Sequence, residues 1–589
     1  MSLPILRPPF VLLDFARSGS HARGLLFHDP VAVFVADRVD EVRPLLDAAE
    51  TATREGNHAV GFVSYDAAPA FDPAFVVNGR TSLPLAWFGI FAAPVTHTPA
   101  LPNVAASQWI PDTGVAAHAA AVEDIRAAIG RGEVYQVNHT IRLRSLESVD
   151  PLALYDRMRE AQPDGYCAFI GTGRHCIASA SPELFFHRRG DTITTQPMKG
   201  TARRGRWVEE DDAAARALAE SEKERAENVM IVDLLRNDLG RIARPGTVRV
   251  PRLFDVERHP TVLQMTSTIE AELEPGTTLG QIFGALFPCG SVTGAPKIAA
   301  MKKIAALERS PRGAYCGTLG WLAPSGESTF SVAIRTASVD REDGIATYGV
   351  GGGITWDSEA SAEFEEVRAK CAVVTTAMPR FELLETMRLT RDGYVRHDRH
   401  VARLIQSARY FGIPADARRI ERALDAHAGD ATEFPRRVRL LVAPDGTPRV
   451  EDRALLDHDP AAPPQTVALA TSPVSSADRF LFHKTTHRVV YERHRAEHPH
   501  AFDVLLWNER DELTEFTIGN VVLRIDGIDW TPPRQCGLLA GTFRAELLDQ
   551  GAIRERPLHL ADLHRAEAAW LINSLREWVP VIAPEVRGA

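Results

Sequence analysis

Large apolar residues recur along the chain with two spacings, one typical of helices and one typical of strands. The run KERAENVMIVDLLRNDL (223–239) is followed by Gly240, and its VMIVDLL part is apolar almost all round, which predicts a helix that is buried at this part and ends near the glycine. In STFSVAIRTASV (328–339) apolar residues alternate with small or polar ones, which predicts one continuous strand. Together the two patterns predict an α+β fold.

A second helical pattern covers residues 358–377, SEASAEFEEVRAKCAVVTTA. Glu363, Glu366 and Lys370 follow at i, i+3 and i+7 on one stripe of this helix. This face is either solvated and stabilised by ion pairs, or a site for a hard cation such as Mg²⁺, which prefers carboxylate oxygens. The neighbouring stripe is apolar and consists of Phe364, Val367, Cys371 and Val374.

A break in the pattern divides the chain into two units. The segment TAMPR (376–380) contains a proline and separates the helical pattern from a new strand-like start, FELLETMRL (381–389). We therefore expect one domain over residues 1–376 and a second over residues 377–589. The second has the size of an independent domain and contains one clear helical pattern, HVARLIQSARYFGI (400–413).

Composition and charge exclude several classes of protein. The chain has 589 residues, of which 45% are hydrophobic and 24% charged, as expected for a soluble globular protein. Its net charge of -10 disfavours broad nucleic-acid binding. Its six cysteines show no spacing typical of disulfide frameworks or zinc fingers, which fits a reducing cytosol. No secretory signal and no membrane-spanning apolar run are visible, so we expect a cytoplasmic protein.

Two charged side chains stand beside apolar segments of the first unit. In TTQPMKGTARRG (194–205) a β-type run ends in an expected turn that presents Lys199 beside a glycine. Glu227 enters the apolar helix, where an unpaired charge is costly and therefore needs a partner. Lys199 is either an ordinary surface lysine or a functional group, and its own segment does not decide between the two.

An arginine and a run of glycines offer places for an anion. The strand pattern puts Arg335 on the face of Ser331 and Ala333, where its guanidinium either receives a carboxylate ligand or is paired structurally. The segment YGVGGGITWDS (348–358) leads to an expected helix start at Ser358, and its backbone N–H groups can hold a carboxylate or phosphate. A glycine-rich segment alone indicates such a site only weakly.

Eight segments of the first unit resemble the chorismate-utilising enzymes, and the resemblance runs over most of residues 60–375. It implies a large mixed α/β sandwich domain. The family includes anthranilate synthase component I, aminodeoxychorismate synthase component I and the isochorismate and salicylate synthases. The segments, in chain order, are YQVNHT (135–140), SPELFF (181–186), QPMKGTARRG (196–205), AENVMIVDLLRNDLGRI (226–242), PCGSVTGAPK (288–297), GAYCGTLGW (313–321), FSVAIRT (330–336) and GGGITWDSEASAEFEEVRAK (351–370).

This resemblance implies roles for particular residues. Mg²⁺ is expected on Glu227 and Glu366, with Glu363 close by. Glu183, in the SPE segment, is the expected general acid that protonates the departing C4 hydroxyl of chorismate. A dicarboxylate substrate needs cationic donors and a metal as hydroxide leaves, which agrees with these roles. The expected contacts of the substrate are Arg335, Tyr315, Lys370, Thr293 and the backbone near Gly352.

Two positions distinguish the members of the family, and a third departs from the pattern of many of them. Gln136 stands where the isochorismate and salicylate synthases carry the lysine that activates water, which disfavours water chemistry. Lys199 stands where anthranilate synthases carry alanine. A lysine there acts as a nucleophile at C2 before ammonia attacks C4, which is the pattern of aminodeoxychorismate synthases. Gln264 replaces a histidine that many members carry near the substrate ring.

The second unit resembles the fold-type IV pyridoxal-phosphate enzymes, and most of all 4-amino-4-deoxychorismate lyase. FLFHKTTHR (480–488) presents Lys484 after an expected aromatic strand, ELTEFTIGN (512–520) presents Glu515, and GLLAGTFR (537–544) ends in an expected helix start. Transaminases of the same fold share these cofactor residues, so the segments indicate the cofactor more strongly than the substrate.

The second resemblance also implies roles by position. Lys484 is the expected lysine that carries pyridoxal 5'-phosphate and moves protons, and Glu515 is expected on the pyridine nitrogen. Expected contacts of the cofactor phosphate are Arg403, Thr542 and the backbone near Ile518, and Thr386 and Arg388 are expected to contact the substrate.

The two resemblances together imply a bifunctional enzyme of folate-precursor synthesis. The first unit would aminate chorismate at C4, and the second would eliminate pyruvate from the product to give 4-aminobenzoate. One alternative is an anthranilate synthase component fused to an amino-acid transaminase. Another is a chorismate- or tryptophan-binding regulator without turnover, although such a protein has no need of Glu183 or Lys484.

The expected partners follow from the chemistry. Chorismate and ammonia are the substrates, and neither nucleic acid nor membrane is expected. No cysteine lies in a GxCxG-type elbow with a downstream His-x-Glu, so we expect a separate glutamine amidotransferase subunit to supply ammonia. The second unit is a candidate for homodimer formation.

Overall fold

A computed structural model of the chain groups it into two compact units. One contains residues 1–203 and 215–378, and the other contains residues 204–214 and 379–589. The expected boundary at residues 376–377 lies outside the described residues. Within the described parts of the chain, no helix is long and apolar enough to cross a membrane. The structure describes residues 7–15, 24–79, 81–96, 107–375, 379–455 and 463–584.

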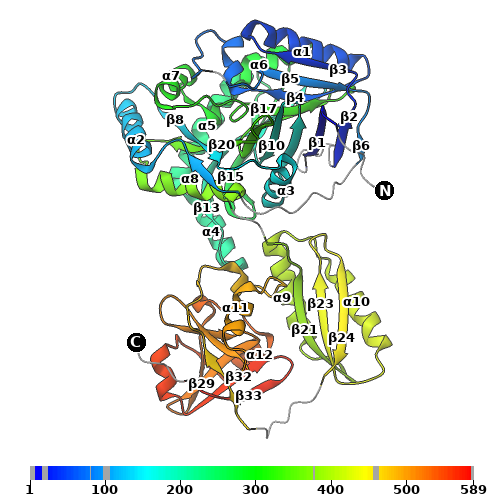
Figure 1. Cartoon of the computed structure of the whole chain (residues 1–589), viewed down its shortest axis with the longest axis vertical. Helices are drawn as coiled ribbons and strands as arrows, with labels where there is room; N and C mark the ends of the chain where they lie inside the picture. The colour runs from blue at the N-terminus through cyan, green and yellow to red at the C-terminus, as the bar shows by residue number, and fades with distance from the viewer. Residues whose placement is uncertain are drawn as a thin grey trace. The chain divides into compact units, whose positions relative to one another are not determined.

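The first unit is built on two ten-stranded sheets that pack against each other (Figure 1). Buried residues of both sheets meet in one core, for example Phe15 and Ile170 of one sheet with Phe62 and Trp87 of the other. The first sheet contains, in order, β16 (Gly294–Ala295), β8 (Gln136–Ser145), β20 (Ala346–Ile354), β19 (Thr336–Asp340), β10 (His175–Ser181), β9 (Tyr166–Gly171), β1 (Phe10–Phe15), β2 (Leu25–His28) and β6 (Val95–Thr96), with β7 (Trp109–Pro111) on β8.

The second sheet contains the strand that carries Lys199 and the strand that begins directly after Glu183. It contains, in order, β13 (Met198–Arg203), β15 (Val262–Glu272), β12 (Thr192–Gln196), β11 (Leu184–Arg189), β18 (Ser328–Val332), β17 (Thr318–Leu322), β4 (His58–Val63), β5 (Ala86–Phe91) and β3 (Ala32–Ala36), with β14 (Arg249–Arg258) on β15.

Helices cover the outer faces of both sheets, because each sheet has a second apolar face to bury. α1 (Val39–Arg54), α5 (Glu222–Gly240) and α6 (Leu279–Leu286) share a core with the second sheet. α3 (Pro151–Ala161) and α8 (Ala360–Thr375) share one with the first sheet, and α2 (Val115–Gly130) and α7 (Lys297–Leu307) pack beside β8. The expected mixed α/β sandwich and the helix predicted over 223–239 are confirmed, and α8 confirms the helical pattern over 358–377 from Ala360 to Thr375, with residues 376–377 outside the described residues. α5 is exposed on one side, for example at Val229, so the expectation that its apolar part is buried all round is wrong.

The second unit contains a small and a large sheet. The small sheet has the order β22 (Gly393–Tyr394), β21 (Leu383–Thr390), β23 (Arg436–Val442) and β24 (Pro448–Ala454). α9 (His397–Phe411) and α10 (Ala417–Asp430) bury one face of this sheet, as Figure 1 shows beside the yellow strands. The helix predicted over 400–413 and the strand predicted over 381–389 are confirmed, with bounds that differ by a few residues.

The large sheet has nine strands and carries the remaining helices, α11 (Val489–Glu497) and α12 (Thr542–Asp549). Its strands are β25 (Gln465–Thr466), β33 (Glu577–Ile582), β32 (Ala568–Asn573), β29 (Gly519–Ile525), β28 (Leu513–Phe516), β27 (Val504–Trp507) and β26 (Ala468–Leu469), with β30 (Ile528–Thr531) on β29 and β31 (Arg554–Glu555) on β30.

Residues 204–214 group with the second unit although they interrupt the first. They include the start of α4 (Val208–Glu220). The Trp207 ring lies 5.0 Å from that of Phe482, and Tyr410 Oη donates to the Gly205 carbonyl at 2.7 Å. The carbonyl of Arg206 also lies 3.2 Å from Nε2 of His483, the residue that directly precedes Lys484 in the chain. Ring contacts and backbone hydrogen bonds thus make this short segment part of the second unit's core.

Candidate functional site

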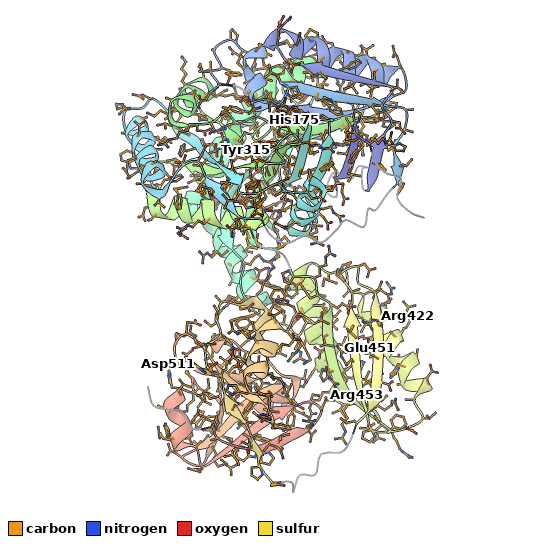
Figure 2. The ribbon with its side chains drawn as sticks, in the orientation of Figure 1. His175, Tyr315, Arg422, Glu451, Arg453 and Asp511 are labelled. Atoms are coloured by element: carbon orange, nitrogen blue, oxygen red, sulfur yellow. The ribbon has the colours of Figure 1, made fainter. Side chains whose placement is uncertain are left out.

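The first unit encloses a cavity of about 200 Å³, which is lined mainly by charged side chains and glycines. Nine of the expected site residues line it: Glu183, Lys199, Glu227, Tyr315, Arg335, Gly352, Glu363, Glu366 and Lys370. Thr293 does not; its hydroxyl donates to the Cys289 carbonyl at 3.0 Å and its own carbonyl accepts from the Asn138 N–H. Figure 2 labels Tyr315 within this unit.

Lys199 lies in a strand, so the expectation that it sits in a turn is wrong. It is part of β13, whose pairing with β15 shifts register between Met198 and Thr201. Gly200 has φ +92, a conformation that a side chain disfavours, and the resulting irregularity turns Lys199 towards the cavity. Gln264 stabilises this geometry because its amide donates to the Gly200 carbonyl at 2.8 Å.

Burial lowers the pKa of Lys199, while the nearby Glu227 raises it and Lys370 lowers it further. The balance favours release of the ammonium proton compared with an exposed lysine. A Cβ on Gly353 would lie 2.8 Å from Lys199 Nζ and 2.1 Å from Gln136 Nε2. Only a glycine therefore leaves space for these two polar groups.

Glu183 is 2% exposed and accepts a hydrogen bond from Ser291 Oγ at 2.5 Å. Burial raises the pKa of its carboxyl to about 7, although Ser291 and Lys199 act to lower it. A carboxyl with this pKa is partly protonated near neutral pH and can donate a proton. Ser291 did not stand out in the sequence, because an isolated serine in a glycine-rich segment indicates no particular role.

Besides Glu183, four carboxylates face the same cavity, one more than the sequence indicated. Glu224 joins Glu227 of α5 and Glu363 and Glu366 of α8. Burial raises the pKa of Glu224, Glu227 and Glu363, whereas the Lys370 ammonium, 2.7 Å away, lowers that of Glu366. The positions i and i+3 on α5 give Glu224 the same spacing that Glu363 and Glu366 have on α8.

The carboxylates fit a hard cation by chemistry, although their side chains are not gathered around one point. No group of three or more His, Cys, Asp or Glu within the described residues has an arrangement that could hold a metal ion. Acids whose pKa is raised by burial and mutual repulsion are nevertheless stabilised by a divalent cation, and oxygen donors suit Mg²⁺.

The glycine run is a strand rather than the expected loop. In β20, Gly351, Gly352 and Gly353 pair with Thr140, His139 and Asn138 of β8. On its other side β20 pairs with β19 over Ala346–Tyr348. Beyond these residues the edge of β20 that is turned away from β8 borders the cavity. Lys370 Nζ donates to the Gly351 carbonyl there at 2.8 Å. The exposed backbone edge can therefore contact a ligand, as expected for Gly352.

Arg335 reaches the cavity because the predicted strand over 328–339 is in fact two strands. β18 belongs to the second sheet and β19 to the first, and Arg335 lies between them with φ +49. The alternation that placed Arg335 on one face with Ser331 therefore does not apply. The Arg335 guanidinium donates to the Gln162 side chain, whose amide lies 2.5 Å from His259 Nδ1. Gln162, which is 0% exposed, gave no sequence signal.

Tyr315 lies flat against β20 in the same cavity. A Cβ on Gly349 would lie 2.1 Å from the Tyr315 ring, so this position also requires glycine. The Arg142 guanidinium lies 5.4 Å from the centroid of this ring. The same guanidinium is buried and pairs with the Glu308 carboxylate at 2.8 Å. Arg312 pairs with the same carboxylate at 2.7 Å, which holds the pKa of Glu308 at about 2 against the effect of burial. A rigid ionic network therefore supports Tyr315.

The second unit encloses a cavity of about 890 Å³, and the expected cofactor residues Lys484, Glu515, Arg403, Thr542 and Ile518 line it. Lys484 follows a 3₁₀ turn over Arg479–Leu481 rather than the expected aromatic strand. Its carbonyl accepts from the Leu384 N–H at 2.9 Å. Burial lowers the pKa of Lys484 to about 8, helped by Arg403 and Arg488. Roughly a tenth of this amine is therefore neutral at pH 7, far more than for an exposed lysine.

Glu515, on β28, is held by two neighbours that the sequence did not indicate. Tyr491 Oη donates to its carboxylate at 2.8 Å, and Asn520 Nδ2 lies 3.4 Å from the other oxygen. Burial raises the pKa of Glu515 to about 7. A carboxylate fixed in this way fits the ring nitrogen of pyridoxal phosphate, because a protonated pyridine nitrogen would stabilise its charged form.

The helix start predicted near Gly541 is confirmed, since α12 begins at Thr542 with Gly541 at its N-cap. A Cβ on Gly541 would lie 2.1 Å from Asn520 Oδ1, so only glycine fits. Free N–H groups at such a helix start suit a phosphate. The Ile518 N–H, in contrast, already donates to Asp503 Oδ2 at 3.2 Å.

Arg403 lines the cavity but is held by a buried ion pair. Its guanidinium donates to Glu385 at 2.6 Å and to the Ala540 carbonyl at 3.0 Å. His400 Nδ1 lies 2.7 Å from the same carboxylate, and the Thr542 hydroxyl lies 3.2 Å from His400 Nε2. Arg403 and His400 hold the pKa of Glu385 at about 2 although burial acts to raise it. Glu385 and His400 were not expected from the sequence.

The two expected substrate contacts of the second unit differ. Thr386 lines the cavity, whereas Arg388 lies on the same strand outside the lining. Both alternate with buried residues of β21, so they share the face that is turned away from α9 and α10.

Comparison with protein families matches each unit to a different family model. Residues 94–376 match the model described as chorismate binding enzyme. Residues 382–583 match the model described as amino-transferase class IV.

Individual relatives match the first unit. Aminodeoxychorismate synthase component 1 of Bacillus subtilis is 40% identical over 258 residues, which are 44% of this chain and 54% of that protein. Anthranilate synthase component 1 of Streptomyces coelicolor is 42% identical over 259 residues, 44% of this chain and 50% of that protein. The chain thus spans about half the length of these curated relatives.

Among solved structures, anthranilate synthase component I from Streptococcus pneumoniae TIGR4 aligns with a TM-score of 0.53 and 26% identity. The alignment covers 64% of this chain and 94% of that one. The similarity supports the sandwich architecture of the first unit.

Proposed function

We propose that this chain, which joins a chorismate binding enzyme (residues 94–376) to a class IV amino-transferase fold (residues 382–583), makes 4-aminobenzoate from chorismate in two steps. The observation that carries the proposal is the position of Lys199 in an acid-lined cavity together with the partly protonated Glu183. Anthranilate synthases resembling this chain carry alanine at that position, so the lysine points to amination at C4.

In the first step Lys199 attacks C2 of chorismate as the C4 hydroxyl leaves. Glu183 gives its proton to that hydroxyl, which departs as water. Ammonia then forms a bond to C4, and the bond between Lys199 and C2 breaks, which restores the lysine and yields 4-amino-4-deoxychorismate. Arg335 and Lys370 hold carboxylates of the substrate, and Tyr315 supports the ring.

Mg²⁺ is part of the proposal. Glu227 and Glu366 would hold it, with Glu224 and Glu363 near by, and the ion would neutralise carboxylate charge as the hydroxyl leaves. The raised pKa of three of these acids is the observation that supports a cation here.

In the second step the other unit eliminates pyruvate from this amine and leaves 4-aminobenzoate. The class IV fold implies pyridoxal phosphate, which supplies an electron sink when bound. Lys484 would hold the cofactor and move a proton from the substrate ring, and Glu515 would stabilise a protonated pyridine nitrogen. Thr542 and the start of α12 would receive the phosphate, with Arg403 near by.

Ammonia comes from a separate glutamine amidotransferase subunit in this proposal, since the chain shows no glutaminase motif. Glutamine alone should therefore not support turnover by the purified chain. Turnover should appear when a glutaminase subunit or ammonium is added.

The direct test is to identify the product that the purified chain forms from chorismate, ammonium, Mg²⁺ and pyridoxal phosphate. 4-Aminobenzoate with an equal amount of pyruvate is expected. Formation of 2-aminobenzoate instead would assign the first unit to the anthranilate synthases. No consumption of chorismate would indicate a binding protein and end the proposal.

A further inference from the structure

A row of arginines crosses the small sheet of the second unit. Arg388 of β21 pairs in register with Arg437 of β23, which pairs in turn with Arg453 of β24. Residues that are directly opposite in antiparallel strands point to the same side of the sheet, with their Cβ atoms roughly 5 Å apart. The three arginine side chains therefore extend from one row across the same face of the sheet.

This face is the one that borders the second cavity. The opposite face is buried by α9 and α10 through residues such as Met387 and Leu440. Arg437 and Arg453 line the cavity of about 890 Å³, and Arg576, at the end of the loop between β32 and β33, lines it as well. Figure 2 labels Arg453 on β24. Arg437 and Arg453 of the row thus form part of the cavity wall, whereas Arg388 lies outside the lining.

Some arginines of this wall are paired with acids: Arg403 lies 2.6 Å from Glu385, Arg439 lies 3.2 Å from Glu451, and Arg495 lies 3.2 Å from Asp503. Of the carboxylates in the described part of the chain, none is within ion-pair distance of Arg437, Arg453 or Arg576. The surroundings of Arg437 lower its pKa, by burial first and then by Arg453, Arg439, Arg576 and Arg488.

Like charges opposite each other destabilise a sheet, so this arrangement lowers the stability of the empty protein. An anionic ligand would remove that repulsion. The cofactor phosphate does not account for the row, because its expected place is the start of α12, where Thr542, Arg403 and Glu385 form a separate hydrogen-bonded group.

We propose that Arg437, Arg453 and Arg576 bind the carboxylates of the amine on which Lys484 acts, and make the second site selective for a dicarboxylate amine. This inference rests on the proposed function. Guanidinium groups bind carboxylates through paired hydrogen bonds. Three unpaired arginines exceed what the single carboxylate of an ordinary amino acid requires, whereas an amine with two carboxylates can engage all of them.

The test uses the full chain loaded with pyridoxal phosphate and supplied with 4-amino-4-deoxychorismate. Arg437→Gln and Arg453→Gln should each raise KM about tenfold or more, because each removes a charge-assisted hydrogen bond. The kcat and the absorbance of the bound cofactor should change little. Arg422→Gln is the matched control, because Arg422 is an exposed arginine on α10, on the other side of the same sheet (Figure 2).

A second measurement does not depend on turnover. Malonate, a small dicarboxylate, should raise the melting temperature of the loaded wild-type protein more than that of Arg437→Gln or Arg453→Gln. Equal shifts in all proteins, or an unchanged KM in both variants, would overturn the inference while the wild type still forms 4-aminobenzoate. A wild type that forms no 4-aminobenzoate contradicts the proposed function instead, and the malonate shifts then decide on the anion site alone.

Discussion

Each unit places a candidate catalytic lysine in a cavity, but the neighbouring charge with the largest effect on that lysine has opposite sign in the two units. Around Lys199 the charged group with the largest effect is Glu227, which acts against the lowering of its pKa by burial. Around Lys484 it is Arg403, which adds to the effect of burial and brings the pKa to about 8. The strongest neighbouring charge therefore favours the protonated amine of Lys199 but the neutral amine of Lys484.

The difference indicates what each site needs before it can work. In the first cavity burial raises the pKa of Glu224, Glu227 and Glu363, so a bound cation would stabilise their charged forms. The arginine-lined second cavity attracts anions without a metal. It is also the larger, about 890 Å³ against about 200 Å³, as expected if it holds a cofactor and a substrate together.

The strongest separation of the two sites should come from Lys484→Ala. This change is expected to abolish the visible absorbance of bound pyridoxal phosphate and to lower 4-aminobenzoate formation by about 10⁴-fold or more. Consumption of chorismate with ammonium should continue at the wild-type rate, measured by loss of chorismate absorbance. An equal loss of chorismate turnover would mean that the sites are not independent.

Removal of divalent cations should affect only the acid-lined site. Excess EDTA is expected to lower chorismate consumption roughly 10³-fold, because the metal supplies several kcal/mol of charge stabilisation. Pyruvate release from supplied 4-amino-4-deoxychorismate should be unchanged. Restoration by Mg²⁺ is the control, and EDTA-resistant chorismate turnover would contradict the metal assignment.

Lys199→Ala should change the product as well as the rate. With no nucleophile at C2, formation of the 4-amino product is expected to fall about 100-fold. Ammonia can then attack C2, so residual turnover should shift towards the 2-amino isomer or 2-aminobenzoate, detected by chromatography. In the wild type, a substrate adduct on the peptide that contains Lys199 should be trapped when ammonia is omitted.

A Lys199→Ala variant that makes the 4-amino product at the wild-type rate would show that Lys199 is not the nucleophile. The choice between the two kinds of amino-chorismate synthase would then be open again.

The smallest expected effect concerns the pH dependence of the first site. Glu183 must carry a proton to act as an acid, and the protonated form prevails below its pKa of about 7. Chorismate turnover should therefore be retained below neutral pH and fall as the pH rises through about 7. Ser291→Ala removes a hydrogen bond that lowers this pKa, so the fall should move to higher pH, with less than about a tenfold change in rate. An unchanged profile would argue against Glu183 as the acid.

Much of the fold could be predicted from periodicity, because α5 and α8 have long, regular apolar stripes. The local setting of Lys199 and Arg335 could not. One lies in an irregular strand and the other between two strands of different sheets, and both positions depend on long-range pairing that no local pattern reveals. The two charged residues were nevertheless recognisable from the segments around them.

The supporting residues of both sites were not predictable for a different reason. Ser291, Gln162 and Glu385 act through single contacts with Glu183, Arg335 and Arg403. Such contacts join residues far apart in the chain, and serine, glutamine and glutamate occur in many ordinary positions. Only the folded chain shows which of them are buried beside a charged partner.

The segment over residues 204–214 limits how the chain can be divided. The second unit is encoded by two separate stretches, since Trp207 packs on Phe482 within it. A gene fragment that begins at residue 379 would produce a protein with that aromatic surface uncovered, next to His483 and Lys484. Exchange of this half with that of another protein would require two simultaneous transplants. The coding sequence of each unit is thus interrupted by part of the other, so recombination cannot transfer either unit as one continuous stretch of DNA.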